Sequence, residues 1–261
     1  MEHHQARKRF GQHFLVDPHY IDRIVAAIAP KPGDNLIEIG PGLAALTGLL
    51  IERAGHLTAI EIDRDLAARL ANYFPPERLT LHVADALTFD FSTLGPKMRV
   101  VGNLPYNISS PLLFHLAGFE TQLRDLHVML QREVVARMTA APGTTDYGRL
   151  TVMLQARFAV SRLFTVPAGA FHPAPKVESA VARLAPLGCA KPVIADQALF
   201  ARIVAAAFGQ RRKTLRNAVA GLCSVDALEA AGIDAGARGE TLSVADFVRL
   251  TATLARQQSA R

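Results

Sequence analysis

The sequence predicts an α/β fold: a parallel sheet of about seven strands, followed by a small all-helical domain. Three observations predict it. From about residue 33, short apolar runs alternate with helical patterns, as in sheets whose strands are joined by helices. A glycine-containing segment follows the first of these runs. Beyond residue 192 the strand pattern ends and helical patterns alone remain.

Seven short apolar segments are expected to form the strands. They cover residues 35–40, 57–63, 79–85, 99–103, 126–130, 154–164 and 179–185. Helices are expected at 43–54 and 64–73, and beyond the sheet at 195–208, 210–221, 225–231 and 243–256. Ser224 and Ser243 are N-cap candidates, and Asp246 follows Ser243 at capping-box spacing. We therefore expect one domain over residues 1–185 and a second over residues 193–261, joined by a Pro- and Gly-containing connection.

Composition excludes several classes of protein. Half of the 261 residues are hydrophobic and one-fifth are charged, which excludes a disordered chain. No apolar run reaches the roughly 18 residues of a membrane span, and no signal-peptide pattern opens the chain. Cys189 and Cys223 are too few for a disulfide framework, and the histidines lack metal-ligand spacing. We expect a soluble cytoplasmic protein with no membrane partner and no metal.

The net charge of +6 is unevenly distributed. Residues 1–12 hold three basic residues against one acidic residue, residues 13–185 hold sixteen of each, and residues 186–261 hold ten against six. Clustered Arg and Lys are typical of nucleic-acid contacts, although a solvated helix face also explains such a cluster. The residues expected to hold RNA are Arg7, Lys8, Arg9, Arg211, Arg212, Lys213 and Arg216.

The glycine loop indicates a nucleotide site of a particular kind. Residues 40–45 read Gly-Pro-Gly-Leu-Ala-Ala and match the loose G-x-G-x-x-G/A pattern, although a tight turn alone also explains the glycines. Pro41 removes one backbone donor that a pyrophosphate uses, and Glu38 places a carboxylate close to the loop. Both features count against a nicotinamide dehydrogenase. They favour a ligand with a positive centre, such as the sulfonium of S-adenosylmethionine.

Polar side chains follow the next three strands. Glu61 stands where a carboxylate can take both ribose hydroxyls, Asp85 where an acceptor can read an adenine amino group, and Asn103 at the end of the fourth strand. Ligands of open α/β sheets bind at the carboxyl ends of the strands. We therefore expect these residues and Glu38 to line one crevice.

The segment Asn103-Leu104-Pro105-Tyr106 indicates chemistry on an exocyclic amine. Pro105 favours an extended Leu104, which can turn the Leu104 carbonyl toward the same point as the Asn103 side-chain oxygen. Two acceptors on one NH₂ group favour its pyramidal form and aim its lone pair at a methyl carbon. Tyr106 offers a face for stacking, worth about 1–3 kcal/mol per base. Positioning and electrostatics can then supply most of the rate without a strong general base.

From residue 7 to about residue 250 the chain resembles the rRNA adenine N6-dimethyltransferases. Residues 7–15 and 38–42 resemble the family's N-terminal and glycine-loop motifs, and residues 171–179 its F-x-P-x-P-K-V-x-S signature. The resemblance implies a Rossmann-like class I S-adenosylmethionine-dependent fold, with S-adenosylhomocysteine as product. It implies a catalytic set of Asn103, Leu104, Pro105, Tyr106 and Phe171, with Phe171 opposite the tyrosine across the target base, and a cofactor set of His13, Leu15, Gly40, Glu61, Asp85 and Asn103.

Two positions depart from the family pattern. Ala44 stands where the family often has Gly, and a methyl group is tolerated there unless the backbone needs a positive φ. His13 stands where Asn is common.

The resemblance extends to one branch of the family. Residues 131–133, 147–150 and 210–217 resemble the branch that dimethylates two adjacent adenosines in the 3′-terminal hairpin loop of 16S rRNA, coupled to small-subunit biogenesis. We expect a monomer acting on an immature small subunit. The alternatives are a large-subunit rRNA methyltransferase of the antibiotic-resistance type and a non-catalytic RNA-binding assembly factor.

Overall fold

The computed structural model describes residues 12–210 and 212–259, and these residues form two compact units. The first unit holds the described residues up to Val135 together with Val160–Pro186. The second holds Ala136–Ala159 together with the described residues from Leu187 onward. Each unit has its own hydrophobic core. No helix within the described ranges is both long enough and apolar enough to cross a membrane.

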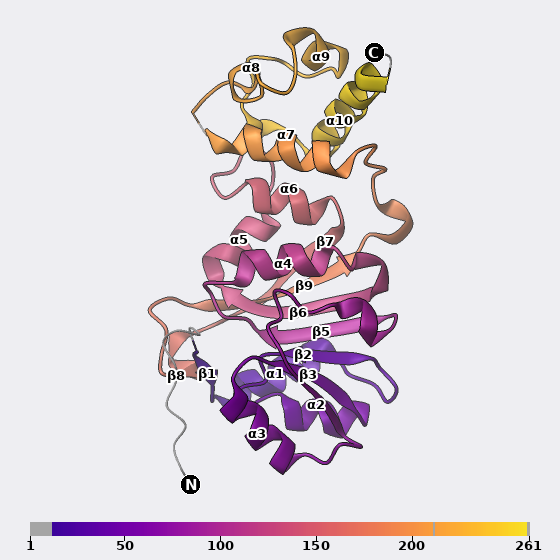
Figure 1. The fold of residues 1–261 in the computed structure, drawn as a ribbon. Helices are drawn as coiled ribbons and strands as arrows, with labels where there is room; N and C mark the ends of the chain where they lie inside the picture. Colours follow the sequence, from indigo (N-terminus) through magenta and orange to yellow (C-terminus); the bar gives the residue numbers. More distant parts are fainter. Residues whose placement is uncertain (1–11, 211, 260–261) are drawn as a thin grey trace. The chain divides into compact units, whose positions relative to one another are not determined.

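A seven-stranded sheet is the main feature of the first unit (Figure 1). Its spatial order is β4-β3-β2-β5-β6-β9-β7. The strands from β4 to β6 pair in parallel, whereas β9 runs antiparallel to β6, so the sheet is mixed rather than wholly parallel as predicted. The strands are β2 (Leu36–Ile39), β3 (Leu57–Glu61), β4 (Leu79–Val83), β5 (Met98–Asn103), β6 (Leu123–Gln131), β7 (Phe158–Val166) and β9 (Ser179–Pro186).

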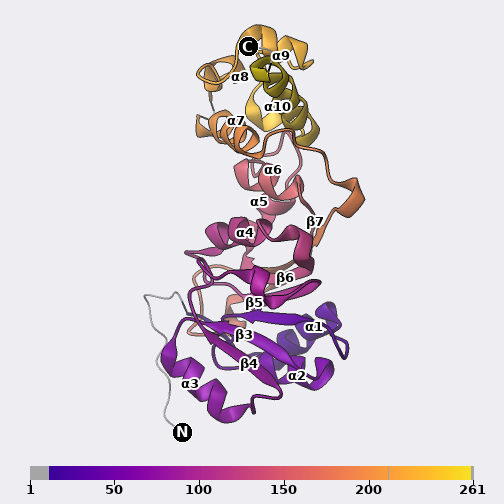
Figure 2. The same cartoon turned by 45° about the vertical axis from the view of Figure 1, so that its right-hand side comes forward.

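The chain order reverses between β2 and β5, which creates a topological switch point at the carboxyl ends of these neighbouring strands. Helices connect the parallel strands, and both views place α1, α2 and α3 beside the β2-β3-β4 half of the sheet (Figures 1 and 2). Asp17 and Asp63 cap α1 and α3 by accepting backbone N–H bonds. The helices are α1 (Pro18–Ile28), α2 (Thr47–Ala54), α3 (Arg64–Tyr73) and α4 (Ser109–Ala117), with α5 (Arg132–Thr139) crossing into the second unit.

A two-stranded sheet joins two distant parts of the first unit. β1 (Phe14–Leu15) pairs antiparallel with β8 (Phe171–His172), and Leu15 lies opposite Phe171. Both of these residues are buried in the core of the unit. The N-terminal motif and the F-x-P-x-P-K-V-x-S signature are therefore neighbours in the fold.

The second unit is helical and packs around an apolar cluster that includes Phe200, Ile203 and Phe247. The hydroxyl of the fully buried Tyr147 donates a hydrogen bond of 2.8 Å to the Leu242 carbonyl. Its helices are α6 (Arg149–Gln155), α7 (Gln197–Gly209), α8 (Leu215–Ala218), α9 (Val225–Ala230) and α10 (Val244–Ser259).

The structure confirms the seven strands and the helical C-terminal region, and it corrects some boundaries. Residues 149–155 form α6, so the strand expected at 154–164 begins at Phe158. The helix expected at 210–221 is reduced to α8. Residues 136–159 pack with the helical unit rather than with the sheet, because Val152 and Ala156 of this segment belong to the second core.

Candidate active site

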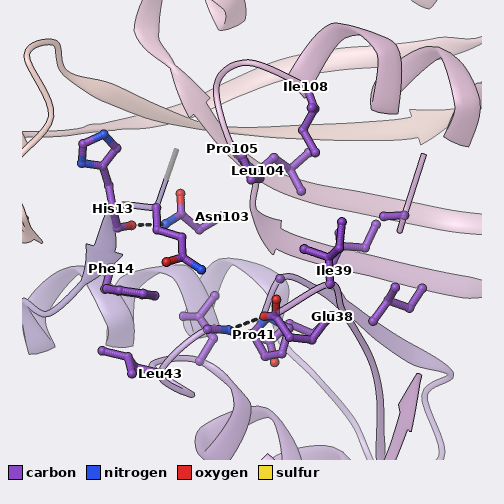
Figure 3. A pocket seen from close by; sticks show the side chains of 18 of the residues that line it. His13, Phe14, Glu38, Ile39, Pro41, Leu43, Asn103, Leu104, Pro105 and Ile108 are labelled. Atoms are coloured by element: carbon purple, nitrogen blue, oxygen red, sulfur yellow. Dashed lines mark hydrogen bonds between the residues drawn. The ribbon is translucent and has the colours of Figure 1, made fainter. Parts of the chain in front are cut away.

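A cavity of about 230 Å³ lies at the carboxyl edge of the sheet, next to the switch point. β1, the glycine loop, the ends of β3 and β5 and the segment after β4 all contribute to its wall. Figure 3 shows His13 and Asn103 on one side of the cavity and Glu38 with Pro41 on the other. The sequence-predicted residues that line it are His13, Leu15, Gly40, Glu61, Asp85, Asn103, Leu104, Pro105 and Tyr106.

The glycine loop makes a tight turn against the cavity. Gly40 and Gly42 adopt positive φ angles of 67° and 58°, a region that favours glycine. A Cβ atom on Gly42 would lie 3.1 Å from the ring of Phe14, so the loop also needs glycine for close packing. The N–H of Gly42 donates to Glu61 Oε2 at 3.2 Å, which joins the loop to the end of β3.

Two buried carboxylates face the cavity from β2 and β3. Glu38 is 3 % exposed and accepts a hydrogen bond of 2.8 Å from the Thr47 hydroxyl. Burial raises the pKa of Glu38 to about 7, and the neighbouring negative charge of Glu61 adds to this shift. Burial also raises the pKa of Glu61, although the N–H groups of Asp63 and Gly42 oppose that shift. Both groups are thus placed where an adjacent positive charge would stabilise the ionised form.

Asp85 lies two residues beyond the end of β4 and accepts the Leu87 N–H at 2.9 Å through Oδ1. Of the described residues around the cavity, three are carboxylates and none is Lys or Arg. Such a wall disfavours phosphate and suits a ligand that is cationic and carries hydroxyl and amino donors.

Asn103 is the last residue of β5, and the nitrogen of its side-chain amide already donates a hydrogen bond. Its Nδ2 donates to the His13 backbone carbonyl at 2.8 Å (Figure 3). This bond directs the Oδ1 oxygen away from β1 as an acceptor for a ligand. Leu104 is held next to it, because its N–H donates to the Met129 carbonyl at 3.1 Å and its side chain is buried.

Tyr106 is held at its hydroxyl, its backbone and its ring. Its hydroxyl shares a hydrogen bond of 2.7 Å with the Ser179 hydroxyl, and its carbonyl accepts one of 3.0 Å from the Ser109 hydroxyl. Its ring lies roughly parallel to that of His13, with centroids 5.7 Å apart and an interplanar angle of 26°. His13 Nδ1 donates to the Pro173 carbonyl at 2.8 Å. Burial raises the pKa of the Tyr106 phenol, which therefore stays protonated at neutral pH.

Phe171 is not brought to the cavity. Its side chain is 4 % exposed and belongs to the hydrophobic core that also contains Leu15 and Val166. Phe171 lies on β8 and is not among the residues that line the cavity. The predicted clamp by Phe171 stays a prediction that requires the ring to leave the core.

Four of the predicted RNA-binding residues lie outside the described residues: Arg7, Lys8, Arg9 and Arg211. Arg212 and Lys213 are exposed just before α8, and Arg216 is exposed on it. The backbone N–H groups of Leu215 and Arg216 donate to the carbonyls of Ala237 and Ala235, which ties this short helix to the segment before α10.

Sequence reasoning gave no role to Phe14 or Ser179, although both lie in the quoted motifs. Phe14 lines the cavity and packs on Gly42, and Ser179 bonds Tyr106. The residue types alone did not indicate these contacts, because a Phe or a single Ser occurs in many environments. Within the described ranges, no group of three or more His, Cys, Asp or Glu side chains is placed to hold a metal ion.

Comparisons with known proteins point to one protein family. The family described as "Ribosomal RNA adenine dimethylase" matches residues 3–256. A protein of Aromatoleum aromaticum named "Ribosomal RNA small subunit methyltransferase A" is 60 % identical over 251 residues, which cover 96 % of this chain and 95 % of that protein. A protein of the same name from Thiobacillus denitrificans is 58 % identical, covering 97 % of this chain and 99 % of that one.

Solved structures give a similar result. A dimethyladenosine transferase from Plasmodium falciparum has a TM-score of 0.81 and 26 % identity, covering 94 % of this chain and 98 % of that one. The 23S rRNA methyltransferase ErmE has a TM-score of 0.69 and 28 % identity, covering 93 % and 99 % of the two chains.

Proposed function

Because the chain belongs to the ribosomal RNA adenine dimethylase family, we propose that the cavity at the switch point brings S-adenosylmethionine and a target adenine together. The protein is an S-adenosylmethionine-dependent methyltransferase that dimethylates adenine N6 in small-subunit (16S) rRNA. One observation carries the assignment of the site: the carboxylate-lined cavity without Lys or Arg among its described lining residues meets Asn103-Leu104-Pro105-Tyr106 at one sheet edge.

The cavity suits the cofactor in charge, and its glycine turn leaves room for a ligand next to the backbone. Glu38 and Glu61 favour a cation, and the turn through Gly40 and Gly42 lets the ligand approach the backbone. Glu61 keeps acceptor capacity beyond its two backbone bonds, so it can take ribose hydroxyls, while Asp85 takes the adenine amino group. His13 and Leu15 close the wall from β1. When bound, S-adenosylmethionine supplies an electrophilic methyl group on a sulfonium.

Asn103 and Leu104 hold the target amine. Before the first methyl transfer, the Asn103 Oδ1 and the Leu104 carbonyl each accept one N6 hydrogen, which withdraws the nitrogen lone pair from the purine ring. The bond from Asn103 Nδ2 to the His13 carbonyl fixes the amide before substrate arrives, so the acceptor is preorganised. Orientation of this kind substitutes for a strong base.

Tyr106 supplies the stacking face for the target base. Its phenol is protonated and bonded to Ser179, so it positions the base rather than removing a proton. The base has to leave its stack to reach the cavity, since N6 in stacked RNA is inaccessible.

The finer features of the substrate belong to the same proposal. The modified nucleosides are two adjacent adenosines in the 3′-terminal hairpin loop of 16S rRNA, and the particle recognised is an immature small subunit. The enzyme acts there as a cytoplasmic monomer. The relatives named for the small subunit, at 58–60 % identity, support this target over that of the large-subunit enzyme at 28 %.

The test is nucleoside mass spectrometry. Under-methylated small subunits are incubated with the protein and S-adenosylmethionine, and large subunits are treated in parallel. We expect N6-dimethyladenosine in small-subunit RNA only. Dimethyladenosine confined to large-subunit RNA would establish the resistance-type alternative, and absence of cofactor binding by calorimetry would establish the non-catalytic assembly factor.

A further inference from the structure

Ser179 lies where two parts of the chain meet beside the cavity. It begins β9 and lies in register opposite Gln131 of β6. Its side chain is completely buried, yet it does not line the cavity, so it has no route to the ligand itself. Its hydroxyl instead meets the Tyr106 hydroxyl at 2.7 Å. The one polar atom of this side chain is thus directed at the residue that presents the stacking face.

The segment that carries Ser179 is fixed on both sides. The Arg132 N–H donates to the Glu178 carbonyl at 2.9 Å, and the Arg132 guanidinium pairs with the Glu178 carboxylate at 2.8 Å. At the other end of the segment, the Pro173 carbonyl accepts the bond from His13 Nδ1. The same short segment therefore contacts both rings of the His13–Tyr106 pair, one through Pro173 and one through Ser179.

We propose that Ser179 is a positioning residue for methylation, because its hydroxyl anchors the far end of the Tyr106 ring beside the amine site. Rotation about the first side-chain torsion swings the phenol ring and moves its hydroxyl, so the bond to Ser179 restrains this swing. The bond from Ser109 to the Tyr106 carbonyl holds the backbone end of the same residue. Without the bond to Ser179, the far end of the ring can swing away from its position beside the amine site. A base stacked on a mobile ring spends less time with N6 on Asn103 and Leu104.

The inference rests on the proposed function, and two measurements keep them apart. The first is single-turnover methylation of under-methylated small subunits by the wild type, Ser179→Ala, Tyr106→Phe and the double variant. We expect each single variant to lose about 10-fold in rate. The double variant should be no slower than either one, because both remove the same bond. Ser179→Thr retains the hydroxyl and should recover most of the rate, and Ser161→Ala, at an exposed position of β7, is the control.

The second measurement needs no methylation. NMR of protein labelled with ¹³C at the tyrosine rings reports four tyrosines, and Tyr106→Phe identifies the Tyr106 signal. We expect Ser179→Ala to shift that signal alone and Ser161→Ala to leave it unchanged. An unchanged Tyr106 signal, full activity of Ser179→Ala or multiplied losses in the double variant would overturn the proposal. A wild type that methylates nothing while the NMR shift occurs would overturn the function and leave the Tyr106–Ser179 lock intact.

Discussion

The two ends of the Asn103 amide have different tasks. The nitrogen is bonded to the His13 carbonyl, and the oxygen remains as an acceptor next to Leu104. A free amide would rotate between two orientations that place either a donor or an acceptor at the target amine. The bond to the His13 carbonyl selects the acceptor orientation, which is the one that the proposed contact with N6 requires.

Replacing Asn103 by Ala should therefore lower the single-turnover methylation rate by about 100-fold or more, since a preorganised polar group is removed from the reacting centre. The rate is measured at saturating cofactor with under-methylated small subunits. Asn72→Ala is the matched control, because Asn72 is exposed on α3 and is not among the residues that line the cavity. Full activity of Asn103→Ala would contradict the amine-holding role.

The raised pKa of Glu38 predicts that the stability of the protein and its affinity for S-adenosylmethionine depend on pH. Folding raises its pKa from 4.5 to about 7, so the folded protein binds this proton more tightly than the unfolded chain does. The resulting stability is fully present below the unfolded pKa and is lost as the pH rises through about 7. The ionised carboxylate attracts a sulfonium, so affinity for S-adenosylmethionine should rise over the same interval.

Calorimetric titrations between about pH 6 and pH 8 check this, with S-adenosylhomocysteine as the uncharged-sulfur control. The affinity ratio of the two ligands should increase with pH in the wild type and stay flat in Glu38→Gln. A ratio independent of pH in the wild type would show that Glu38 does not interact with the cationic centre.

At the scale of elements, the glycine loop carries a strained residue just before α2. Ala44 has a φ of 66°, in the left-handed region that costs a non-glycine residue roughly 1–2 kcal/mol. The turn requires a positive φ at this position, which a glycine would adopt without this strain.

Ala44→Gly should raise the free energy of unfolding by about 1 kcal/mol, since relief of strain exceeds the added entropy of the unfolded chain. Ala45→Gly is the control, because Ala45 does not have a positive φ and its replacement should destabilise the protein. Urea denaturation measures both. Equal destabilisation by the two variants would contradict the account of the turn.

The strands and the site were predictable to different extents. Runs such as residues 57–61 are short, apolar and rich in branched residues, and they formed strands as expected. Residues 154–157 were wrongly assigned to a strand because a short apolar stretch fits a helix or a strand equally well. Residues 154 and 155 end α6, and Ala156 packs into the second core. The strand β9 was predicted, but its antiparallel direction was not, because pairing direction depends on contacts far apart in sequence.

The residues of the cavity were also predictable to different extents. Glu61 and Asn103 were placed correctly at strand ends, because parallel strands bring their carboxyl ends to one edge. The burial of Phe171 and the bond from Ser179 to Tyr106 depend on the register of β1 with β8 and of β6 with β9. Local sequence does not specify such long-range registers.

For the whole molecule, the distribution of charge predicts that chemistry and RNA binding use different parts of the chain. Residues 13–185 have equal numbers of acidic and basic residues, and the surplus lies in residues 1–12 and 186–261. A cavity for a cation gains nothing from surrounding positive charge, whereas RNA backbone requires it. We therefore expect the two activities to be separable by mutation.

Changing Arg211, Arg212 and Lys213 together to Gln should weaken RNA binding and flatten its salt dependence. The log–log slope should fall by about 0.7–0.9 for each phosphate that the protein no longer neutralises. Cofactor affinity should not change. Filter binding over a salt series measures the RNA affinity, and calorimetry measures the cofactor affinity. The control variant, with Arg53, Arg64 and Arg69 changed to Gln, removes the same amount of charge. Loss of cofactor affinity in the first variant would show that the separation is wrong.

The central claim is that the protein uses the cavity at the switch point to methylate adenine N6 in the 3′-terminal hairpin of 16S rRNA. Mass spectrometry of nuclease fragments from treated small subunits tests it most directly, because it gives both the modified base and its position. We predict N6-dimethyladenosine at two adjacent positions of the hairpin fragment with the wild type, and neither with Asn103→Ala. Dimethyladenosine in other fragments, or an unchanged product with Asn103→Ala, would contradict the account.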